Sequence, residues 1–166
     1  IANLEIPEQC AEIILAKKPD VIINAAAYTD VEKAEEEEEL ANTINGDSPK
    51  AMAEAAEIID SPLIHISTDY VFDGTFNEPN LVNTKTNPIN AYGRSKLLGE
   101  EAIKKTNCVY VILRTSWVFS KYGKNFVKSI IGASRNSEQI EVVADQVGGP
   151  TPAKQLAKTC LKISCR

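Results

Sequence analysis

The sequence is poor in metal-binding side chains, with one histidine and four cysteines among 166 residues. No two cysteines form a C-x-x-C pair and His65 supplies the only imidazole, so a structural zinc site is not expected and no metal is predicted. Without a pairing pattern, the cysteines are expected to be reduced thiols of a cytosolic protein. They are Cys10, Cys108, Cys160 and Cys165.

Basic residues are fewer than acidic ones, 18 against 23, and the net charge is -5. No basic stripe is visible, which argues against a nucleic-acid partner. No apolar run is long enough to cross a bilayer and no signal peptide is recognised, so we expect no membrane partner and a cytoplasmic location. The length and a hydrophobic content of 43% fit one soluble globular domain, or most of one.

Short apolar runs alternate with stretches of helical periodicity along the chain. Helices are predicted at residues 7–18, 48–59, around Tyr92 and Lys96 to about 106, at 125–133 and from 152 onward, and strands at 21–23, 63–66, 109–113 and 141–143. The alternation predicts an α/β fold with a parallel sheet and right-handed crossovers. Ligands of such sheets bind beyond the carboxyl ends of the strands, which here are residues 24–27, 67–69 and 114–117.

Three other features have a structural and a functional interpretation. The five carboxylates at 35–39 fit a metal or partner site, but a solvated helix start is favoured because negative charge stabilises the positive end of the helix dipole. Arg114, at a strand end, fits a phosphate site, and a buried salt bridge explains it at least as well. His65 lies inside a strand and is expected to be structural. Residues 74–90 are polar and are predicted to form a long surface loop.

Tyr92 and Lys96 are four residues apart and therefore share one face of a helix. A neighbouring ammonium favours the phenolate and would make the phenol a better proton donor. Thr68, at a strand end, could hold a substrate oxygen beside them. Spacing alone fits a plain helix-start aromatic better, and Thr68 alone fits a turn cap equally well. The three together favour carbonyl reduction.

The chain resembles the extended short-chain dehydrogenase/reductases, and among them the dTDP-4-dehydrorhamnose reductase family. The resemblance rests on five segments that occur in the family's order and span nearly the whole chain. They are Asn-Ala-Ala-Ala-Tyr-Thr at 24–29, His-Ile-Ser-Thr-Asp-Tyr-Val-Phe-Asp-Gly at 65–74, Tyr-Gly-Arg-Ser-Lys at 92–96, Arg-Thr-Ser-Trp at 114–117 and Asp-Gln-Val-Gly-Gly-Pro-Thr at 145–151.

The resemblance implies reduction of the C4 ketone of dTDP-4-dehydro-6-deoxy-L-mannose, a nucleotide sugar, with NADPH or NADH as cofactor. Tyr92 would protonate the C4 oxygen, Thr68 would hydrogen-bond it, and Lys96 would lower the pKa of Tyr92 and hold the nicotinamide ribose. The cofactor would also contact Asn3, Leu4, Ala25, Ala26, Ala27, Tyr28 and Thr29. The substrate would also contact Asp69, Trp117 and Gln146. Asn45 would support the lysine through water.

The chain departs from this family in one large feature, because its eight glycines contain no G-x-G-x-x-G spacing. We therefore expect a Rossmann-like doubly wound parallel sheet that is incomplete at the N-terminus, lacking a βαβ start of about 30 residues. Residues 1–166 would form a partial NAD(P)-binding domain, with the substrate-binding part starting at about residue 117. Asn3 replaces an acidic residue near the adenine, and Gly149 replaces a serine of the substrate site.

Two other functions fit the same resemblance. A non-catalytic regulatory module, like the regulatory subunit of methionine adenosyltransferase, shares the fold. An epimerase or dehydratase of another nucleotide sugar shares the tyrosine and the lysine. The retained Thr68, Tyr92 and Lys96 favour an enzyme over the first, and the 67–72 and 114–117 segments favour the reductase over the second. The quaternary structure that we consider is a homodimer.

Overall fold

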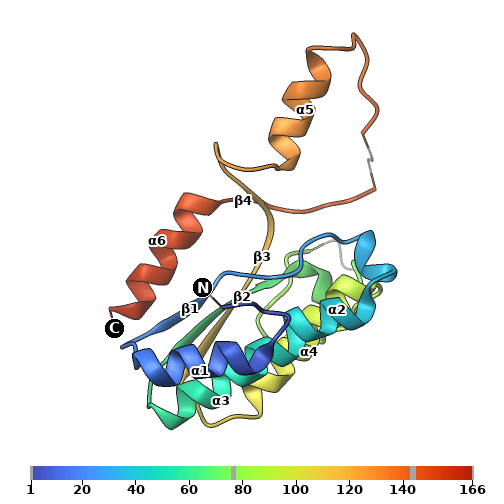
Figure 1. The fold of residues 1–166 in the computed structure, drawn as a ribbon. Helices are drawn as coiled ribbons and strands as arrows, with labels where there is room; N and C mark the ends of the chain where they lie inside the picture. Colours follow the sequence, from blue (N-terminus) through green and yellow to red (C-terminus); the bar gives the residue numbers. More distant parts are fainter. Residues whose placement is uncertain (1, 76–77, 143–144, 166) are drawn as a thin grey trace. The chain divides into compact units, whose positions relative to one another are not determined.

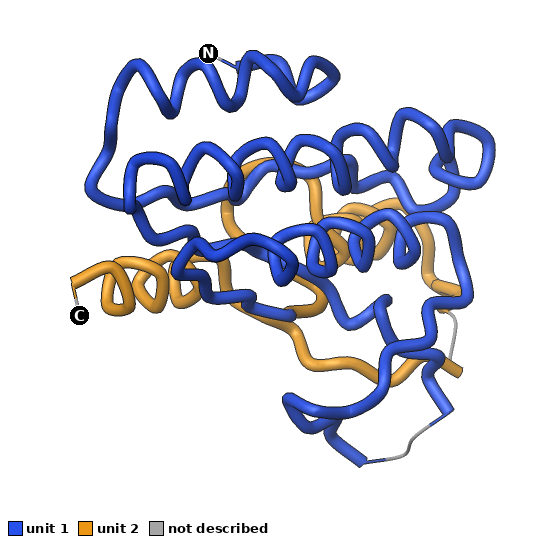
Figure 2. The backbone as a smooth tube through the Cα atoms, turned by 90° about the horizontal axis from the view of Figure 1, so that it is seen from below, with its two compact units in different colours: residues 1–114 blue, residues 115–166 orange. Residues whose placement is uncertain are grey.

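Parallel strands that alternate with helices organise the chain (Figure 1). The computed structural model describes residues 2–75, 78–142 and 145–165. The chain divides into two compact units, which we call unit 1 (residues 1–114) and unit 2 (residues 115–166), coloured separately in Figure 2. Hydrogen-bonded strands follow one another in the order β1-β2-β3-β4. The predicted Rossmann-like α/β fold is confirmed.

Unit 1 contains most of the regular structure, and the third strand continues from it into unit 2. The helices and strands of unit 1 are α1 (Pro7–Lys17), β1 (Ile22–Asn24), η1 (Lys33–Glu35), α2 (Glu38–Asn42), the π-helix η2 (Thr43–Asp47), α3 (Ser48–Ile58), β2 (Leu63–Thr68), η3 (Asp69–Val71), α4 (Ala91–Lys104) and the start of β3 (Tyr110–Phe119). Unit 2 holds the end of β3 with α5 (Phe126–Ser134), β4 (Pro150–Pro152) and α6 (Ala153–Ser164).

Local sequence chemistry sets several of these boundaries. Pro7 occupies the first turn of α1, where its missing N–H costs nothing, and Lys18 ends the helix in the left-handed conformation at φ 45°. The side chain of Asn90 caps α4 by accepting a hydrogen bond of 2.7 Å from the Gly93 N–H. This cap fixes the first turn of the helix that carries Tyr92.

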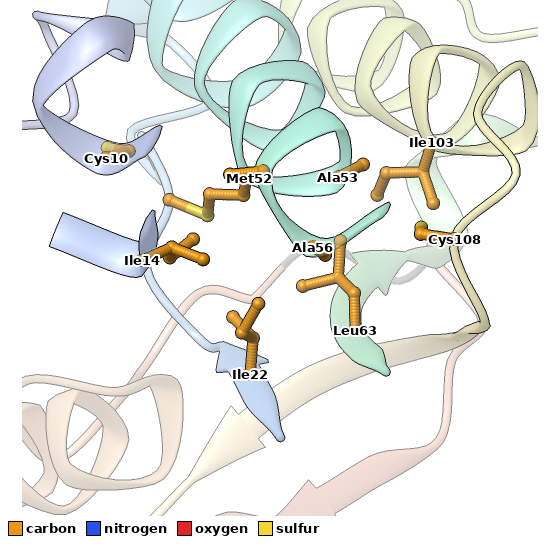
Figure 3. Packing of buried hydrophobic residues seen from close by; sticks show 10 residues of the cluster. Cys10, Ile14, Ile22, Met52, Ala53, Ala56, Leu63, Ile103 and Cys108 are labelled. Carbon is orange, nitrogen blue, oxygen red and sulfur yellow. The ribbon is translucent and has the colours of Figure 1, made fainter. Parts of the chain in front are cut away.

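The hydrophobic core of unit 1 lies between its helices and the strands β1 and β2 (Figure 3). Figure 3 shows side chains from α1, α3 and α4 meeting those of the two strands and of Cys108, which follows α4. The labelled side chains are Cys10, Ile14, Ile22, Met52, Ala53, Ala56, Leu63, Ile103 and Cys108. The alanines of α3 keep that helix close to the sheet because they add little side-chain volume. Strand β2 is buried along nearly its whole length, as expected for a strand covered on both faces.

The parallel register brings the ends of β1 and β2 together. Ile22 pairs with Leu63, and Asn24 pairs with His65. In unit 2, β3 pairs with β4 in parallel from Ser116 opposite Pro150, and the Thr115 hydroxyl donates to the Thr151 hydroxyl at 2.7 Å. Residues that follow β1 and β2 therefore emerge at one edge of the sheet of unit 1.

The C-terminal part differs most from the sequence-based expectation. The predicted strand at 141–143 is wrong for Glu141 and Val142, which have no strand conformation, and Val143 lies outside the described residues. The fourth strand is β4, whose two prolines lack the N–H groups of an ordinary strand, so the pattern of apolar residues did not reveal it. Strand β3 is also longer than predicted, and the last helix begins at Ala153 instead of Pro152.

The lengths and compositions of the helices bear on the question of a membrane span. Among the helices of the described residues, none combines the length and the apolar character needed to cross a bilayer.

Gly99 lets α4 pack directly on the π-helix η2. A Cβ at this position would overlap the backbone carbonyl of Asn45, and that carbonyl belongs to a buried segment that cannot move freely. Gly132 of α5 provides a contrast, because a Cβ there meets nothing within 4 Å.

We predict that Gly99→Ala destabilises the protein by about 1–3 kcal/mol, the usual cost of overpacking. The matched change Gly132→Ala should be neutral or stabilise by up to about 1 kcal/mol, because alanine is the better helix former. Urea unfolding of the full-length protein measures both. Equal stability of the two variants would contradict the close approach of α4 to η2.

Candidate functional site

The candidate site is built at the carboxyl end of β2. Thr68 is the last residue of the strand and caps η3, because its hydroxyl oxygen accepts a hydrogen bond of 3.2 Å from the Tyr70 N–H. The same hydroxyl donates to the Asp69 carboxylate at 3.1 Å. Thr68 is buried and Asp69 half-buried, and burial raises the pKa of the Asp69 carboxyl. A hydroxyl and a carboxylate are thus fixed together at the strand end.

Tyr92 projects from the first turn of α4 onto this strand end. Its half-buried ring packs edge-on against the Tyr70 ring, with centroids 5.6 Å apart. Gly93 permits the approach, because a Cβ there would overlap the Tyr70 carbonyl. The side chain of Thr68 lies close enough to the Tyr92 phenol to lower its pKa. The structure therefore brings Thr68 and Tyr92 together, as the sequence predicted.

The predicted lowering of the Tyr92 pKa by Lys96 stays a prediction. Burial raises the pKa of Tyr92 and outweighs the opposite effect of the Thr68 side chain, and Asp69 and Tyr70 raise it further. In this structure the Nζ atom of Lys96 donates to the Ile66 carbonyl at 2.8 Å. Tyr92 and Lys96 both lie on α4, as predicted from their spacing.

Lys96 is buried, with 2% of its surface exposed. Its Nζ also lies 3.3 Å from Nε2 of His65, which is itself fully buried. Burial lowers the pKa of Lys96 to about 8, although the nearby Glu100 raises it. A lysine with such a pKa changes its charge close to neutral pH.

The segment predicted to line the cofactor leaves the adjacent strand β1. Ala25, Ala26 and Thr29 are exposed, while Ala27 and Tyr28 are half-buried. These small exposed side chains would let a ligand approach the backbone closely.

Asn45 anchors this segment to the rest of the unit. Its side chain accepts from the Tyr28 N–H at 2.9 Å and donates to the Tyr28 carbonyl and the Ser95 hydroxyl, both at 3.0 Å. It therefore joins the residues after β1 to α4. Its predicted support of the lysine through water stays a prediction.

The remaining predicted cofactor contacts lie before α1. Asn3 is exposed and its side chain accepts from the Glu5 N–H at 3.1 Å, so it shapes its own turn. Leu4 is half-buried, packs against the core, and its carbonyl accepts a hydrogen bond of 2.6 Å from Ser48. Their contact with a cofactor stays a prediction.

Two predicted substrate contacts belong to unit 2. Trp117 is 37% exposed and has a positive φ of 45°, which is strained for a residue with a Cβ. Its ring lies 6.0 Å from that of Phe126, and a Cβ at Gly148 would come within 3.1 Å of the indole. Gln146 is exposed. Contact of either residue with substrate stays a prediction.

The buried carboxylate of Glu100 and the half-buried guanidinium of Arg114 form an ion pair, which confirms the salt-bridge interpretation of Arg114. The guanidinium makes two bonds of 2.8 and 2.6 Å to the carboxylate, which is fully buried and also accepts from Ser67 at 2.6 Å. Sequence reasoning missed Glu100, although its spacing of four residues from Lys96 placed both on one face of the helix.

The pKa of Glu100 reflects these competing effects. Burial alone would raise it, but the hydrogen bonds from Arg114 and Ser67, together with Lys104, lower it to about 2. Glu100 is therefore a carboxylate at neutral pH.

The acidic run at 35–39 leads into the short helix α2, whose first turn contains Glu38 and Glu39, so the helix start favoured from the sequence is confirmed. Two of its members also hold α4: Glu35 accepts from the Ala91 N–H at 2.8 Å, and Glu38 pairs with Arg94 at 2.9 Å. In the described part of the chain, no group of three or more histidine, cysteine or acidic side chains is arranged to hold a metal ion.

Comparison with known proteins shows the family of the chain. The family model described as "RmlD substrate binding domain" matches residues 1–166. The chain belongs to this family. A dTDP-4-dehydrorhamnose reductase of Burkholderia thailandensis is 44% identical over 156 residues, covering 94% of this chain and 52% of that protein. The chain thus spans about half the length of the curated relatives it matches.

Solved structures of family members have the same fold. A dTDP-4-dehydrorhamnose reductase of Clostridium acetobutylicum superposes with a TM-score of 0.91 at 42% identity, over 96% of this chain and 57% of that one. Another, of Bacillus anthracis, solved in complex with NADP, gives 0.92 at 40% identity, over 98% and 58%. At these identities the family's segments can be compared directly with the residues of this site.

We predict that Arg114→Met destabilises the protein by about 3–5 kcal/mol at pH 7, because it leaves a buried carboxylate without its main partner. The double variant Glu100→Gln/Arg114→Met should recover a large part of this loss, since it leaves no buried carboxylate without its partner. Urea unfolding of the three proteins measures the difference. A single variant as stable as the double one would contradict the buried pair.

The same pair predicts a pH dependence. The pKa of Glu100 is about 2 in the folded state and about 4.3 in an unfolded chain. The ionised carboxylate therefore contributes its full stabilisation above a pH of about 4.3. This stabilisation is lost as the pH falls toward 2. The stability difference between the wild type and Glu100→Gln/Arg114→Met should therefore shift against the wild type between pH 5 and 2. A difference that does not change with pH would contradict this assignment.

Proposed function

We propose that this chain forms the cofactor- and ketone-facing part of a dTDP-4-dehydrorhamnose reductase. The reaction would be reduction of the C4 ketone of dTDP-4-dehydro-6-deoxy-L-mannose to dTDP-L-rhamnose, with NADPH or NADH. The observation that carries the proposal is the meeting of the Thr68 hydroxyl and the Tyr92 phenol at the end of β2. Membership of the family and the names of its relatives support the choice of substrate.

Each residue near the ketone has a role that its environment permits. Because burial raises its pKa, Tyr92 is a neutral phenol at neutral pH and can give its proton to the C4 oxygen. Thr68 would donate to the same oxygen after releasing Asp69, its present acceptor. Asp69 would then be free to accept from a sugar hydroxyl.

The cofactor would lie along the exposed segment after β1. When bound, the reduced nicotinamide supplies the hydride. The chain's own contribution is to shape the surface, with Ala25, Ala26 and Thr29 exposed and Tyr28 held by Asn45. Lys96 would reach the nicotinamide ribose by turning from the Ile66 carbonyl. The complex of the Bacillus anthracis relative with NADP supports this class of cofactor.

Unit 2 would supply the start of the substrate-binding part, with Trp117 against the sugar and Gln146 near the nucleotide. The strained backbone at Trp117 supports a role in binding, because such strain concentrates at functional sites. A homodimer and a cytoplasmic location also stay predictions, which size-exclusion chromatography and cell fractionation can test.

We predict that Tyr92→Phe lowers kcat roughly 10²–10⁴-fold, the usual loss when a positioned acid is removed. Tyr110→Phe is the matched control, because Tyr110 lies on β3 with 39% of its surface exposed and should leave kcat unchanged. Absorbance of the reduced cofactor, followed with the full-length protein and dTDP-4-dehydro-6-deoxy-L-mannose, measures both.

Two outcomes would count against the proposal. Unchanged turnover in Tyr92→Phe would remove the phenol from its role. A wild-type protein that binds the cofactor but never consumes it would favour the regulatory module over the reductase.

A further inference from the structure

Three buried polar side chains form a continuous row beneath the candidate site. Asn24 ends β1, His65 lies in the middle of β2, and Lys96 comes from α4. Asn24 Nδ2 is 3.1 Å from His65 Nδ1, and His65 Nε2 is 3.3 Å from Lys96 Nζ. All three are buried, so water does not compete for these bonds. The proposed reaction uses Lys96 but gives His65 no role.

The hydrogen bond that Asn24 accepts from the backbone determines which groups of this row donate and which accept. The backbone N–H of Ala26 donates to Asn24 Oδ1 at 3.2 Å, so the amide must present its NH₂ group to the imidazole. Nδ1 of His65 is then an acceptor. Burial, and next the charge of Lys96, lower the pKa of His65 to about 3, so the ring is neutral and carries its single proton on Nε2.

This tautomer determines which form of the lysine fits. The Nε2–H of His65 points at Lys96 Nζ, and only a neutral amine has the lone pair to accept it. If Lys96 were an ammonium group, its N–H groups and the Nε2–H of His65 would be donors that face each other without an acceptor. To accept from an ammonium, His65 must carry its proton on Nδ1, and Asn24 must then turn its Oδ1 to that proton. The Ala26 N–H would lose its acceptor in the same step.

We propose that His65 is a positioning residue that links the charge of Lys96, through its own tautomer and the Asn24 amide, to the backbone N–H of Ala26. The proton balance is simple. When the ammonium becomes an amine, one proton passes from Nζ to Nε2 and the imidazole releases its Nδ1 proton to solvent. His65 stays neutral throughout, and the row loses one proton in total.

The neighbouring Glu100 keeps its charge near neutral pH, so the linkage depends on the charge of Lys96. Glu100, one helical turn further along α4, acts on both Lys96 and His65, and its pKa of about 2 keeps it ionised. Arg114 and Lys104 pair with that carboxylate. Since the pKa of Lys96 is about 8, the ammonium arrangement predominates below that pH and the amine arrangement above it.

The consequence for the proposed reaction concerns the cofactor segment. If the proposed function holds, the freed Ala26 N–H becomes an additional donor to a bound cofactor when Lys96 is charged. The linkage itself does not require that the protein be a reductase, so it can be tested without any measurement of activity.

The decisive experiment is ¹⁵N NMR of the imidazole in the full-length protein from pH 6 to 10, with the His65 signals identified by their absence in His65→Gln. We expect the ring to change from the Nδ1–H to the Nε2–H tautomer in one step near pH 8, with the Ala26 amide signal moving in the same step. Lys96→Met should abolish the step. A tautomer that stays constant, or a step that survives in Lys96→Met, would overturn the proposal.

Asn24→Asp provides a second test with a defined sign. A carboxylate only accepts, so it should hold His65 as the Nδ1–H tautomer at every pH and raise the pKa of the Lys96 amine, read from its own ¹⁵Nζ signal. His65→Gln offers an oxygen to the ammonium and should raise that pKa too. Thermal unfolding confirms that each variant is folded. Variants that are folded and leave the Lys96 titration unchanged would show that His65 only fills space.

Discussion

The site depends on the buried polar face of α4. Lys96 and Glu100 are one turn apart on a helix that packs on β2, and each would be costly to bury without partners. Glu100 is held by Arg114 and Ser67, and Lys96 by the Ile66 carbonyl and His65. Because these bonds fix the helix along β2, they also fix Tyr92 at its first turn beside Thr68.

Close packing of α4 against its neighbours brings the partners of these hydrogen bonds within reach. Gly93 and Gly99 are neighbours of backbone carbonyls in η3 and η2, and neither has room for a side chain. The helix is further held at its start by Glu35 and Glu38, which precede it by more than fifty residues. Local chain geometry and distant charges thus act on the same turn, which carries the phenol.

The sequence predicted the helices and buried strands of unit 1 well, because apolar runs and proline signals mark them directly. It also placed Thr68 and Tyr92 together, since a strand end and a helix start are visible as patterns. It could not show the direction of the Lys96 side chain, which depends on which buried acceptors lie within reach. It missed Glu100 for the same reason, and it missed β4 because proline-containing strands lack an apolar alternation.

The π-helix η2 has a consequence for how this region tolerates change. Residues 38–58 form one continuous helical path in which α2, η2 and α3 follow without a break, and Asn45 lies in the wider turn. Deleting a single residue there would restore ordinary α-helical winding and rotate everything beyond it by about 100°. Asn45 would then face away from Tyr28 and Ser95. Length, and not only composition, is therefore constrained in a stretch that looks like unremarkable helix.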